Sequence, residues 1–419
     1  MDILIAGGGI GGLTAALALH AKGHSVTVYE AAPELQPLGV GINLLPHAVS
    51  VLADLGLLDD LAKLGVETQE LVFFNKFGQR IWREPRGLEA GYPVPQFSLH
   101  RGELQMLLLD TARARLGPAC VREGFAYVRH TVWPSGRVGV WFDTGTGGDL
   151  YGPVVADALI GADGIHSAVR KSFYPDEGPP HWSGAVLWRA AIEDAPFLSG
   201  RSMIMAGHEN QKLVVYPISQ QAFEAGRSLT NWIVEIRIGK PGDLPPSRES
   251  WNKPGRFEDF MPAFKDWSFD WLDFPALAAK TPEALEFPMV DRDPVPAWSF
   301  GPVTLLGDAA HPMYPVGSNG ASQAILDARA LTESLADGAG DVHGALKSYE
   351  AERLPATAAL VAANRRQGPE QVMQMVEERA PNGFDQLDDV ISQAELEAVS
   401  RQYKQVAGFD KAAVARILK

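Results

Sequence analysis

The sequence is poor in cysteine, in positive charge and in long apolar runs. Its 419 residues hold one cysteine, Cys120, which excludes an intramolecular disulfide and a cysteine-rich metal site. Lysine and arginine number 37 against 51 acidic residues, and the formal net charge of −14 argues against nucleic acid and an anionic membrane surface as partners. Glycines interrupt the apolar residues 3–21, which follow Asp2, so we expect neither a signal peptide nor a membrane span there or elsewhere.

The first 30 residues carry a glycine motif in the order strand, turn, helix, strand. Ile3–Ala6 and Val26–Tyr29 are short apolar runs typical of buried parallel strands. The first glycine of the motif allows a tight turn, the second lets the backbone approach a pyrophosphate, and the third allows close packing of helix and strand. These three glycines are Gly7, Gly9 and Gly12. Glu30 ends the second strand, where its carboxylate can bind an adenosine ribose. The pattern predicts a dinucleotide site without separating FAD from NAD.

Two later motifs follow predicted strands. Residues 159–170 read LIGADGIHSAVR, with Asp163 after the strand Ala158–Gly161. Residues 304–312 read TLLGDAAHP, with Gly307 and Asp308 after the strand Val303–Leu306. With these three motifs in this order, residues 1 to about 360 resemble the class of flavoprotein monooxygenases typified by para-hydroxybenzoate hydroxylase. The resemblance implies an α/β fold: a Rossmann-type, three-layer FAD domain with an inserted β-rich substrate domain and C-terminal helices.

The resemblance also implies a set of FAD contacts. Arg101 in HRGELQ is expected near the ribityl and phosphate groups, Asp163 near FAD and the path of the nicotinamide cofactor, and Asp308 at the ribityl or ribose hydroxyls. Each has a structural alternative: Arg101 pairing with Glu103 at the surface, Asp163 as a turn aspartate, and Asp308 as a helix N-cap. Gly41 in PLGVGIN is a further expected contact. The last ones, Gly317, Asn319 and Gly320, precede a late helix at a point where most relatives carry Gly-Gln-Gly.

The N-terminus of that late helix is expected to face the flavin pyrimidine ring, where its dipole stabilises the anionic reduced flavin. No second glycine motif occurs, so NADH or NADPH is expected to bind transiently on the same domain. No metal site is evident.

The chain divides into segments of different texture. Residues 1–72, 97–180 and 285–360 are predicted to form a discontinuous FAD-binding domain, and residues 361–419 a helical C-terminal segment. Residues 73–96 and 181–284 are predicted to form the substrate domain, a mostly antiparallel sheet with strand-like runs such as Leu213–Tyr216 and Trp232–Ile236. The expected location is the cytoplasm, and the expected assembly is a monomer or a homodimer.

Whole phrases carry a more specific resemblance. They include PLGVGIN at 37–43, EPRGLEAG at 84–91, SLHRGELQM at 98–106, PMVDRDP at 288–294 and YPVGSNGASQAILD at 314–327. These phrases are similar to bacterial hydroxylases of phenazine biosynthesis that act on 5-methylphenazine-1-carboxylate. The resemblance implies a single-component enzyme that uses NAD(P)H, O2 and a flavin C4a-hydroperoxide. Its expected reaction is hydroxylation of a planar aromatic or N-heteroaromatic substrate, with or without loss of a carboxylate.

The substrate side is marked by aromatic and apolar residues that suit a dry pocket. Tyr216 and Pro315 are the candidate catalytic residues, and no general base is evident. Lys212 and Tyr216 are four apart, so a strand would place both on one face. Arg189 is either an anion clamp or a solvent-exposed strand residue, and His311 is assigned a structural hydrogen bond. The candidate pocket residues, each of which also fits a hydrophobic core, are Trp188, Met203, Met205, Val214, Tyr216, Trp232, Met289, Tyr314 and Pro315.

Two other functions fit the same fold. One is a flavin-dependent halogenase or reductase, although Trp188-Arg189-Ala190 differs from the Trp-x-Trp-x-Ile-Pro motif usual in halogenases. The other is a non-catalytic protein that binds or sequesters a ligand on an FAD fold. The intact dinucleotide motifs favour the hydroxylase.

Overall fold

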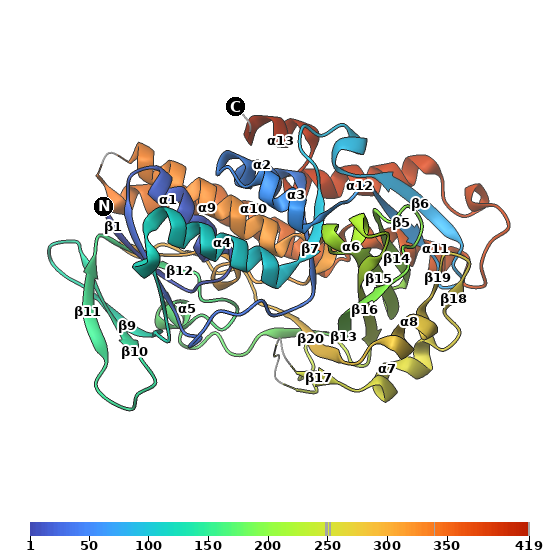
Figure 1. The fold of residues 1–419 in the computed structure, drawn as a ribbon, viewed down its shortest axis with the longest axis horizontal. Helices are drawn as coiled ribbons and strands as arrows, with labels where there is room; N and C mark the ends of the chain where they lie inside the picture. Colours follow the sequence, from blue (N-terminus) through green and yellow to red (C-terminus); the bar gives the residue numbers. More distant parts are fainter. Residues whose placement is uncertain (248–249, 251–252, 339, 418–419) are drawn as a thin grey trace.

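A five-stranded parallel sheet lies at the centre of the N-terminal half of the molecule (Figure 1). The computed structural model describes residues 1–247, 250, 253–338 and 340–417. All neighbouring strands of this sheet are parallel. In spatial order they are β21 (Val303–Leu305), β12 (Ala158–Gly161), β1 (Asp2–Ala6), β2 (Ser25–Glu30) and β8 (Val121–Glu123). The predicted strand–helix–strand unit and the two later strands are therefore confirmed.

The parallel sheet is the middle of three layers. One outer layer is a row of helices in mutual contact: α4 (Arg101–Leu116), α1 (Ile10–Ala21), α9 (Gly320–Asp337) and α10 (Val342–Arg365). The other is an antiparallel sheet of β9 (Ala126–Val132), β10 (Val138–Asp143) and β11 (Tyr151–Ala156). The ring of Phe142 in β10 stacks on Tyr29 in β2, with ring centroids 4.0 Å apart. This arrangement confirms the predicted three-layer domain.

Smaller elements connect these layers. A short sheet of β3 (Gly41–Leu44), β7 (Phe97–His100) and β4 (Val66–Glu67) lies near α2 (Pro46–Asp54) and α3 (Leu58–Leu64). Helix α5 (Ala168–Phe173) follows β12. The 3-10 turns are η1 (Gly87–Ala90), η2 (Pro118–Cys120), η3 (Gly307–Ala309), η4 (Val316–Ser318), η5 (Gly368–Glu370) and η6 (Leu387–Asp389).

An eight-stranded sheet forms the other half of the molecule. Its spatial order is β17 (Pro254–Gly255), β20 (Ala284–Asp291), β13 (His181–Asp194), β16 (Ser228–Arg237), β15 (Gln211–Pro217), β14 (Ser202–His208), β5 (Glu70–Phe74) and β6 (Arg80–Pro85). All its strand pairs are antiparallel except β14 with β5, which is parallel. The prediction of a mostly antiparallel sheet is confirmed. The sheet includes residues 70–72 and 285–291, which lie in the segments predicted for the FAD-binding domain, and the division into domains stays a prediction.

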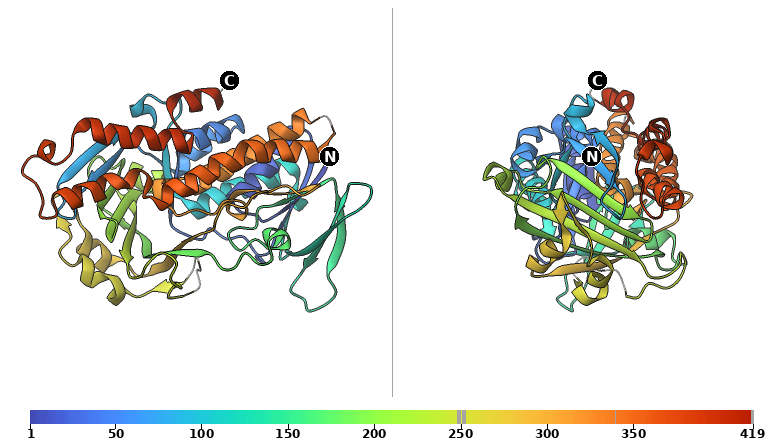
Figure 2. Two further views of the ribbon diagram at one scale, coloured as in Figure 1. Left: turned by 180° about the vertical axis from the view of Figure 1, so that it is seen from behind. Right: turned by 90° about the vertical axis from the view of Figure 1, so that its right-hand side faces the viewer.

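The two faces of this sheet pack against different partners. Helices α7 (Phe257–Phe264) and α8 (Phe274–Lys280) cover one face, where Trp188 and Trp232 contact Phe260. Helices α11 (Gln371–Arg379) and α12 (Gln393–Ala407) cover the other face (Figure 2). The remaining elements are α6 (Gln220–Glu224), β18 (Ser268–Phe269), β19 (Leu272–Asp273) and α13 (Lys411–Ile417). The C-terminal segment thus packs on the eight-stranded sheet, so its side chains can line a site on that face of the sheet.

None of the described helices has the length and apolar character needed to cross a bilayer. The described residues also contain no group of three or more His, Cys, Asp or Glu side chains placed to hold a metal ion.

The fold buries one histidine in a way that makes stability depend on pH. His47 in α2 is fully buried, and burial lowers its pKa to about 3 from 6.5. The folded protein therefore keeps the ring neutral while the unfolded chain binds a proton below pH 6.5. The stability that His47 confers is complete above pH 6.5 and is lost as the pH falls towards 3, by up to about 1.4 kcal/mol per pH unit.

We predict that His47→Gln flattens the dependence of the unfolding free energy on pH between pH 6.5 and 4. Urea unfolding at several pH values measures this slope. The control is His343→Gln at an exposed histidine of α10, which should keep a slope closer to that of the wild type. Equal slopes in the wild type and His47→Gln would show that the buried ring does not set the pH dependence.

Candidate active site

The carboxyl ends of the parallel strands bring the three sequence motifs to one edge. Gly7 follows β1, Glu30 ends β2, Asp163 follows β12, and Gly307 follows β21 closely. In an open parallel sheet, ligands bind at this edge because loops diverge there and helices begin there. Residues separated by up to 300 positions in the chain therefore line one site.

The glycine motif forms a cradle that side chains would fill. A Cβ atom on Gly7 would lie 2.3 Å from the carbonyl oxygen of Ala162, and one on Gly12 would lie 2.1 Å from that of Gly7. A Cβ atom on Gly9 would meet no atom within 4 Å. Gly9 is the N-cap of α1, and no side chain caps this helix end. The helix therefore presents backbone N–H groups to open space, which fits the pyrophosphate of a dinucleotide.

The Glu30 carboxylate is held in place by the backbone. It accepts hydrogen bonds from the N–H groups of Gly8 (2.6 Å) and Ala32 (2.8 Å). Each oxygen uses one acceptor position in this way and keeps another for a hydroxyl. This geometry suits an adenosine ribose, and it also gives Glu30 a part in shaping the glycine loop.

Arg101 and Asp308 lie close enough to affect each other's ionisation. Burial lowers the pKa of Arg101, and the Asp308 charge partly offsets this. Although the Asp308 side chain is exposed, desolvation by the surrounding protein raises its pKa. The positive charges of His311 and Arg101 act in the opposite direction and lower this pKa. Opposite charges at this edge suit the phosphates and hydroxyls that join the two halves of FAD.

Asp163 directs its carboxylate to the start of α5. It accepts hydrogen bonds from the Ser167 hydroxyl and from the N–H groups of Ala168 (2.7 Å) and Val169 (3.1 Å). Burial nevertheless raises its pKa. These contacts match the structural alternative for Asp163, a turn residue that fixes the following helix, and its contact with FAD stays a prediction.

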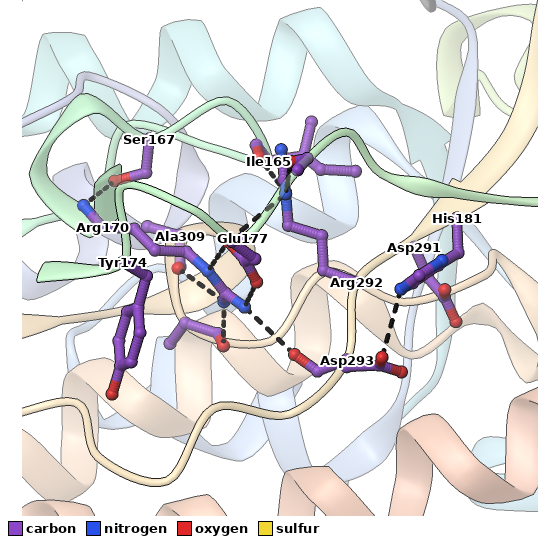
Figure 3. Close-up of polar contacts among 12 residues, drawn as sticks. Ile165, Ser167, Arg170, Tyr174, Glu177, His181, Asp291, Arg292, Asp293 and Ala309 are labelled. Carbon is purple, nitrogen blue, oxygen red and sulfur yellow. Dashed lines mark hydrogen bonds and ion pairs between the residues drawn. The ribbon is translucent and has the colours of Figure 1, made fainter. Parts of the chain in front are cut away.

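Arg170 joins the second and third motifs, a role the sequence did not reveal. Its guanidinium donates to the carbonyl oxygens of Ala309 (3.1 Å), Ala310 (2.8 Å) and Asp293 (3.0 Å) and to the Glu177 carboxylate (Figure 3). Arg170 is almost completely buried. It therefore fixes the backbone that follows Asp308.

Asp327 holds the same backbone from the other side. Its buried carboxylate accepts hydrogen bonds from the N–H of Gly307 (3.0 Å), from His311 Nε2 and from Arg353 Nε (2.8 Å). Burial alone raises a carboxyl pKa, but His311 and Arg353 outweigh it and lower the pKa of Asp327 to about 2. These contacts agree with the structural hydrogen bond assigned to His311.

The loop before α9 is shaped by the C-terminal segment. Gly317 and Ser318 have φ angles of 65° and 58°, in the left-handed region. A Cβ atom on Gly317 would lie 2.1 Å from the Tyr403 hydroxyl. The Asn319 side chain donates to this hydroxyl (2.9 Å) and to the Gly317 carbonyl (3.0 Å). Asn319 is thus engaged within the protein, and any contact it makes with FAD would come from its backbone, at the uncapped start of α9.

The predicted pocket residues separate into two groups. Trp188 and Trp232 lie in the core between the eight-stranded sheet and helices α7 and α8, with the Trp232 indole donating to Thr281 (3.1 Å). The other face of the sheet carries Met203, Met205, Val214 and Tyr216, together with residues of α11. Because Trp188 and Trp232 fill a packed core away from these residues, we leave them out of the proposed pocket.

A cavity of about 350 Å³ lies between the sheet and the C-terminal segment, and we call it the large cavity. Met289, Tyr314 and Val316 line it together with polar residues of β15, β16 and η5. Met203 and Met205 line a second cavity of about 20 Å³, beside Gly317 and Ser318. Both cavities adjoin the loop 314–318, and the large one falls in the size range of small-molecule pockets.

Tyr216 lies where the FAD-side elements meet the large sheet. A Cβ atom on Gly41 would lie 2.5 Å from a Tyr216 ring carbon, and the Gly41 N–H donates to Asn231 (2.8 Å). Burial raises the pKa of Tyr216, so its hydroxyl stays protonated. The charge of Arg189 lies close enough to oppose this rise in the pKa of Tyr216. Burial and the nearby charge of Arg101 lower the pKa of Arg189 itself to about 10. Arg189 is buried, so the solvent-exposed alternative for it is wrong.

A buried ionic cluster that was not predicted from the sequence lies on the polar wall of the large cavity. Lys212 contacts the carboxylates of Glu235 (2.8 Å) and Glu370. Burial opposes the charge on Lys212, but the two carboxylates outweigh it and raise its pKa. Glu370 also accepts a hydrogen bond from the Gly317 N–H (3.4 Å). The cluster therefore connects the sheet to the loop 314–318.

The comparisons with known proteins agree with this geometry. The FAD binding domain family model matches residues 1–224 and 277–364. The chain is 49% identical to the phenazine 1,6-dicarboxylic acid hydroxylase of Lysobacter antibioticus, over 87% of this chain and 89% of that protein. It is 32% identical to a 3-amino-4-hydroxybenzoate 2-monooxygenase of Streptomyces platensis, over 92% and 94%. The fold matches that of Klebsiella pneumoniae HpxO complexed with FAD and uric acid, with a TM-score of 0.72 at 24% identity, over 99% and 97%.

We predict that Glu30→Ala weakens FAD binding while the protein stays folded. A charge-assisted hydrogen bond contributes about 1.5–3 kcal/mol, which corresponds to about 10- to 150-fold in affinity. Titration of the apoprotein with FAD, followed by flavin fluorescence, measures the dissociation constant. The control is Asp157→Ala, which also removes a carboxylate that accepts a backbone N–H, but at the opposite edge of the same sheet. Unchanged FAD affinity in Glu30→Ala would remove Glu30 from the site.

Proposed function

The chain belongs to the FAD binding domain family and is an FAD-dependent hydroxylase, and from this premise we propose that its substrate is a planar N-heteroaromatic acid, a phenazine that carries a carboxylate. The observation that carries the proposal is the large cavity beside the loop 314–318, where apolar walls adjoin charged groups that include Lys212, Arg237 and Arg365. A relative that is 49% identical over 372 residues is a phenazine 1,6-dicarboxylic acid hydroxylase. The proposed reaction is hydroxylation, with or without loss of a carboxylate, with NADH or NADPH as the reductant.

The proposed FAD residues are those that the resemblance to flavoprotein monooxygenases implies, and the geometry of the sheet edge supports the glycine motif and Glu30 among them. Gly7, Gly9 and Gly12 would receive the pyrophosphate at the start of α1, and Glu30 the adenosine ribose. Arg101, Asp163, Gly307 and Asp308 would hold the middle of the cofactor, and Gly41, Gly317, Asn319 and Gly320 its flavin end. Bound FAD supplies the electrons, taken from NAD(P)H, with which O2 is activated.

The residues of this chain would position the ring and keep water away. Met289 and Tyr314 line the large cavity, Met203 and Met205 the small one, and Pro315 lies in the loop between them. We propose that the protonated Tyr216 hydroxyl donates a hydrogen bond to an oxygen or ring nitrogen of the substrate. No hydrogen bond from the described residues occupies this hydroxyl.

The assembly and location remain part of the proposal. A monomer or homodimer in the cytoplasm is consistent with the lone Cys120, which is buried, and with the net charge of −14.

We predict that a phenazine carboxylate accelerates NADH or NADPH oxidation and is converted to a hydroxylated product. Without substrate, oxidation should be slow and should yield H2O2. With labelled O2, the added oxygen of the product should carry the label. Label arriving from water would contradict a monooxygenase reaction. Stimulation by benzoates but by no phenazine would instead contradict the proposed substrate alone.

Tyr216→Phe should raise the substrate dissociation constant about 2- to 10-fold, the effect of one neutral hydrogen bond. It should also increase the share of NADH oxidation that ends as H2O2, since a poorly held ring reacts less often. FAD content should stay normal. The control is Tyr127→Phe in β9, which removes a hydroxyl bonded to His130 in the three-stranded sheet. Identical dissociation constants and product yields in the wild type and Tyr216→Phe would place Tyr216 outside the pocket.

A further inference from the structure

Among the described residues that line the large cavity, the permanently charged cations form ion pairs with one exception. Of the three cavity residues that carry a permanent positive charge, Lys212 contacts Glu235 and Glu370. Arg365 forms ion pairs with Asp291 (2.7 Å) and Asp293 (2.7 Å). Arg237 is the third, and no carboxylate of the described residues forms an ion pair with its guanidinium.

Arg237 is fixed by the backbone. Its Nη1 atom donates to the carbonyl oxygen of Ser183 (2.6 Å), in the neighbouring strand β13. It follows Glu235 by two residues in β16, so both side chains point to the same face of the sheet. Arg237 is half-buried and lines the large cavity. A guanidinium has five N–H donors, so most of its donors remain for a ligand.

Charges of both signs surround Arg237. Its cluster holds the carboxylates of Glu235 and Glu370 with Lys212, and the carboxylates of Glu209 and Asp293 also line the cavity. Arg237 is close enough to lower the pKa of Glu235, although burial, the larger effect, raises it. A carboxylate at Arg237 would meet a cation that is already oriented and only partly neutralised, beside the apolar side chains of Met289 and Tyr314.

We propose that Arg237 binds the carboxylate of the aromatic substrate and so makes the enzyme specific for acids. This inference rests on the proposed function, because it places an aromatic acid in the large cavity. The planar fork of a guanidinium matches the two oxygens of a carboxylate, and the apolar walls receive the ring. Arg237 is thus a specificity-determining residue that the sequence motifs did not indicate.

The test compares an acid with its neutral analogue. Binding of phenazine-1-carboxylate and of unsubstituted phenazine to the FAD-loaded enzyme is measured by the change in flavin absorbance, so that turnover is not needed. In Arg237→Met the dissociation constant of the acid should rise about 10- to 150-fold, the range for a charge-assisted hydrogen bond. That of phenazine should change less than about 2-fold. Arg237→Lys keeps the positive charge without the planar fork, and its dissociation constant for the acid should lie between those of the wild type and Arg237→Met.

The control variant is Arg227→Met. It removes an exposed arginine that precedes β16 and forms an ion pair with Glu193. It should bind both ligands as the wild type does. FAD content and the melting temperature show whether Arg237→Met is folded, and Arg237→Lys provides the comparison if it is not. An unchanged ratio of the two dissociation constants in the Arg237 variants overturns the proposal.

The failure of the proposed function gives a different result. If the wild type binds no phenazine but binds benzoates or nicotinates, the phenazine assignment is wrong, and the acid is then compared with the unsubstituted ring of the class that binds. Loss of discrimination in Arg237→Met then still supports the role of Arg237. A wild type that binds neutral analogues as tightly as acids overturns it.

Discussion

One buried carboxylate, that of Asp327, holds together the backbone on which the FAD site depends. It accepts hydrogen bonds from the Gly307 N–H, from His311 and from Arg353, which come from the end of a strand, the following turn and helix α10. Removing it would leave Arg353 buried without its partner, a loss that typically costs about 3–5 kcal/mol. Arg170 secures the same turn from the opposite side through the carbonyl groups of Ala309 and Ala310. Asp308 therefore projects from a rigid turn, which is what an ordered contact with a cofactor requires.

The FAD side of the site could be predicted because backbone geometry determines it. Gly7 and Gly12 are each required by a local approach of two backbone segments, and such requirements leave a fixed spacing in the sequence. The strands before Asp163 and Asp308 are short apolar runs with the pattern of buried parallel strands, and the structure has them where the pattern put them. The partners Asp327 and Arg353 were not predicted, because an aspartate and an arginine in two amphipathic helices look like ordinary surface residues until the helices pack.

The substrate side was harder to predict because strand periodicity gives two faces without saying which one meets the cofactor. Lys212 and Tyr216 do share a face, as their spacing required. Trp188 and Trp232 were predicted for the pocket on their aromatic character alone, yet they point to the face covered by α7 and α8. The C-terminal segment was predicted as helical without a role. In the structure, Tyr403 and Glu370 reach from it into the loop 314–318, over a separation in sequence that no local pattern records.

The two sides of the site thus differ in the physics that defines them. The proposed cofactor side consists of backbone N–H groups and glycines, whose geometry the fold itself determines. The proposed substrate side consists of side-chain charges. Lys212, Arg237 and Arg365 share the cavity wall with four carboxylates, so a change at any of these positions alters the charge that the cavity offers to a ligand. With the role proposed for Arg237, a neutral residue in its place would weaken the binding of acids without touching the residues proposed to bind FAD. Substrate preference in such a fold is therefore expected to diverge faster than cofactor binding.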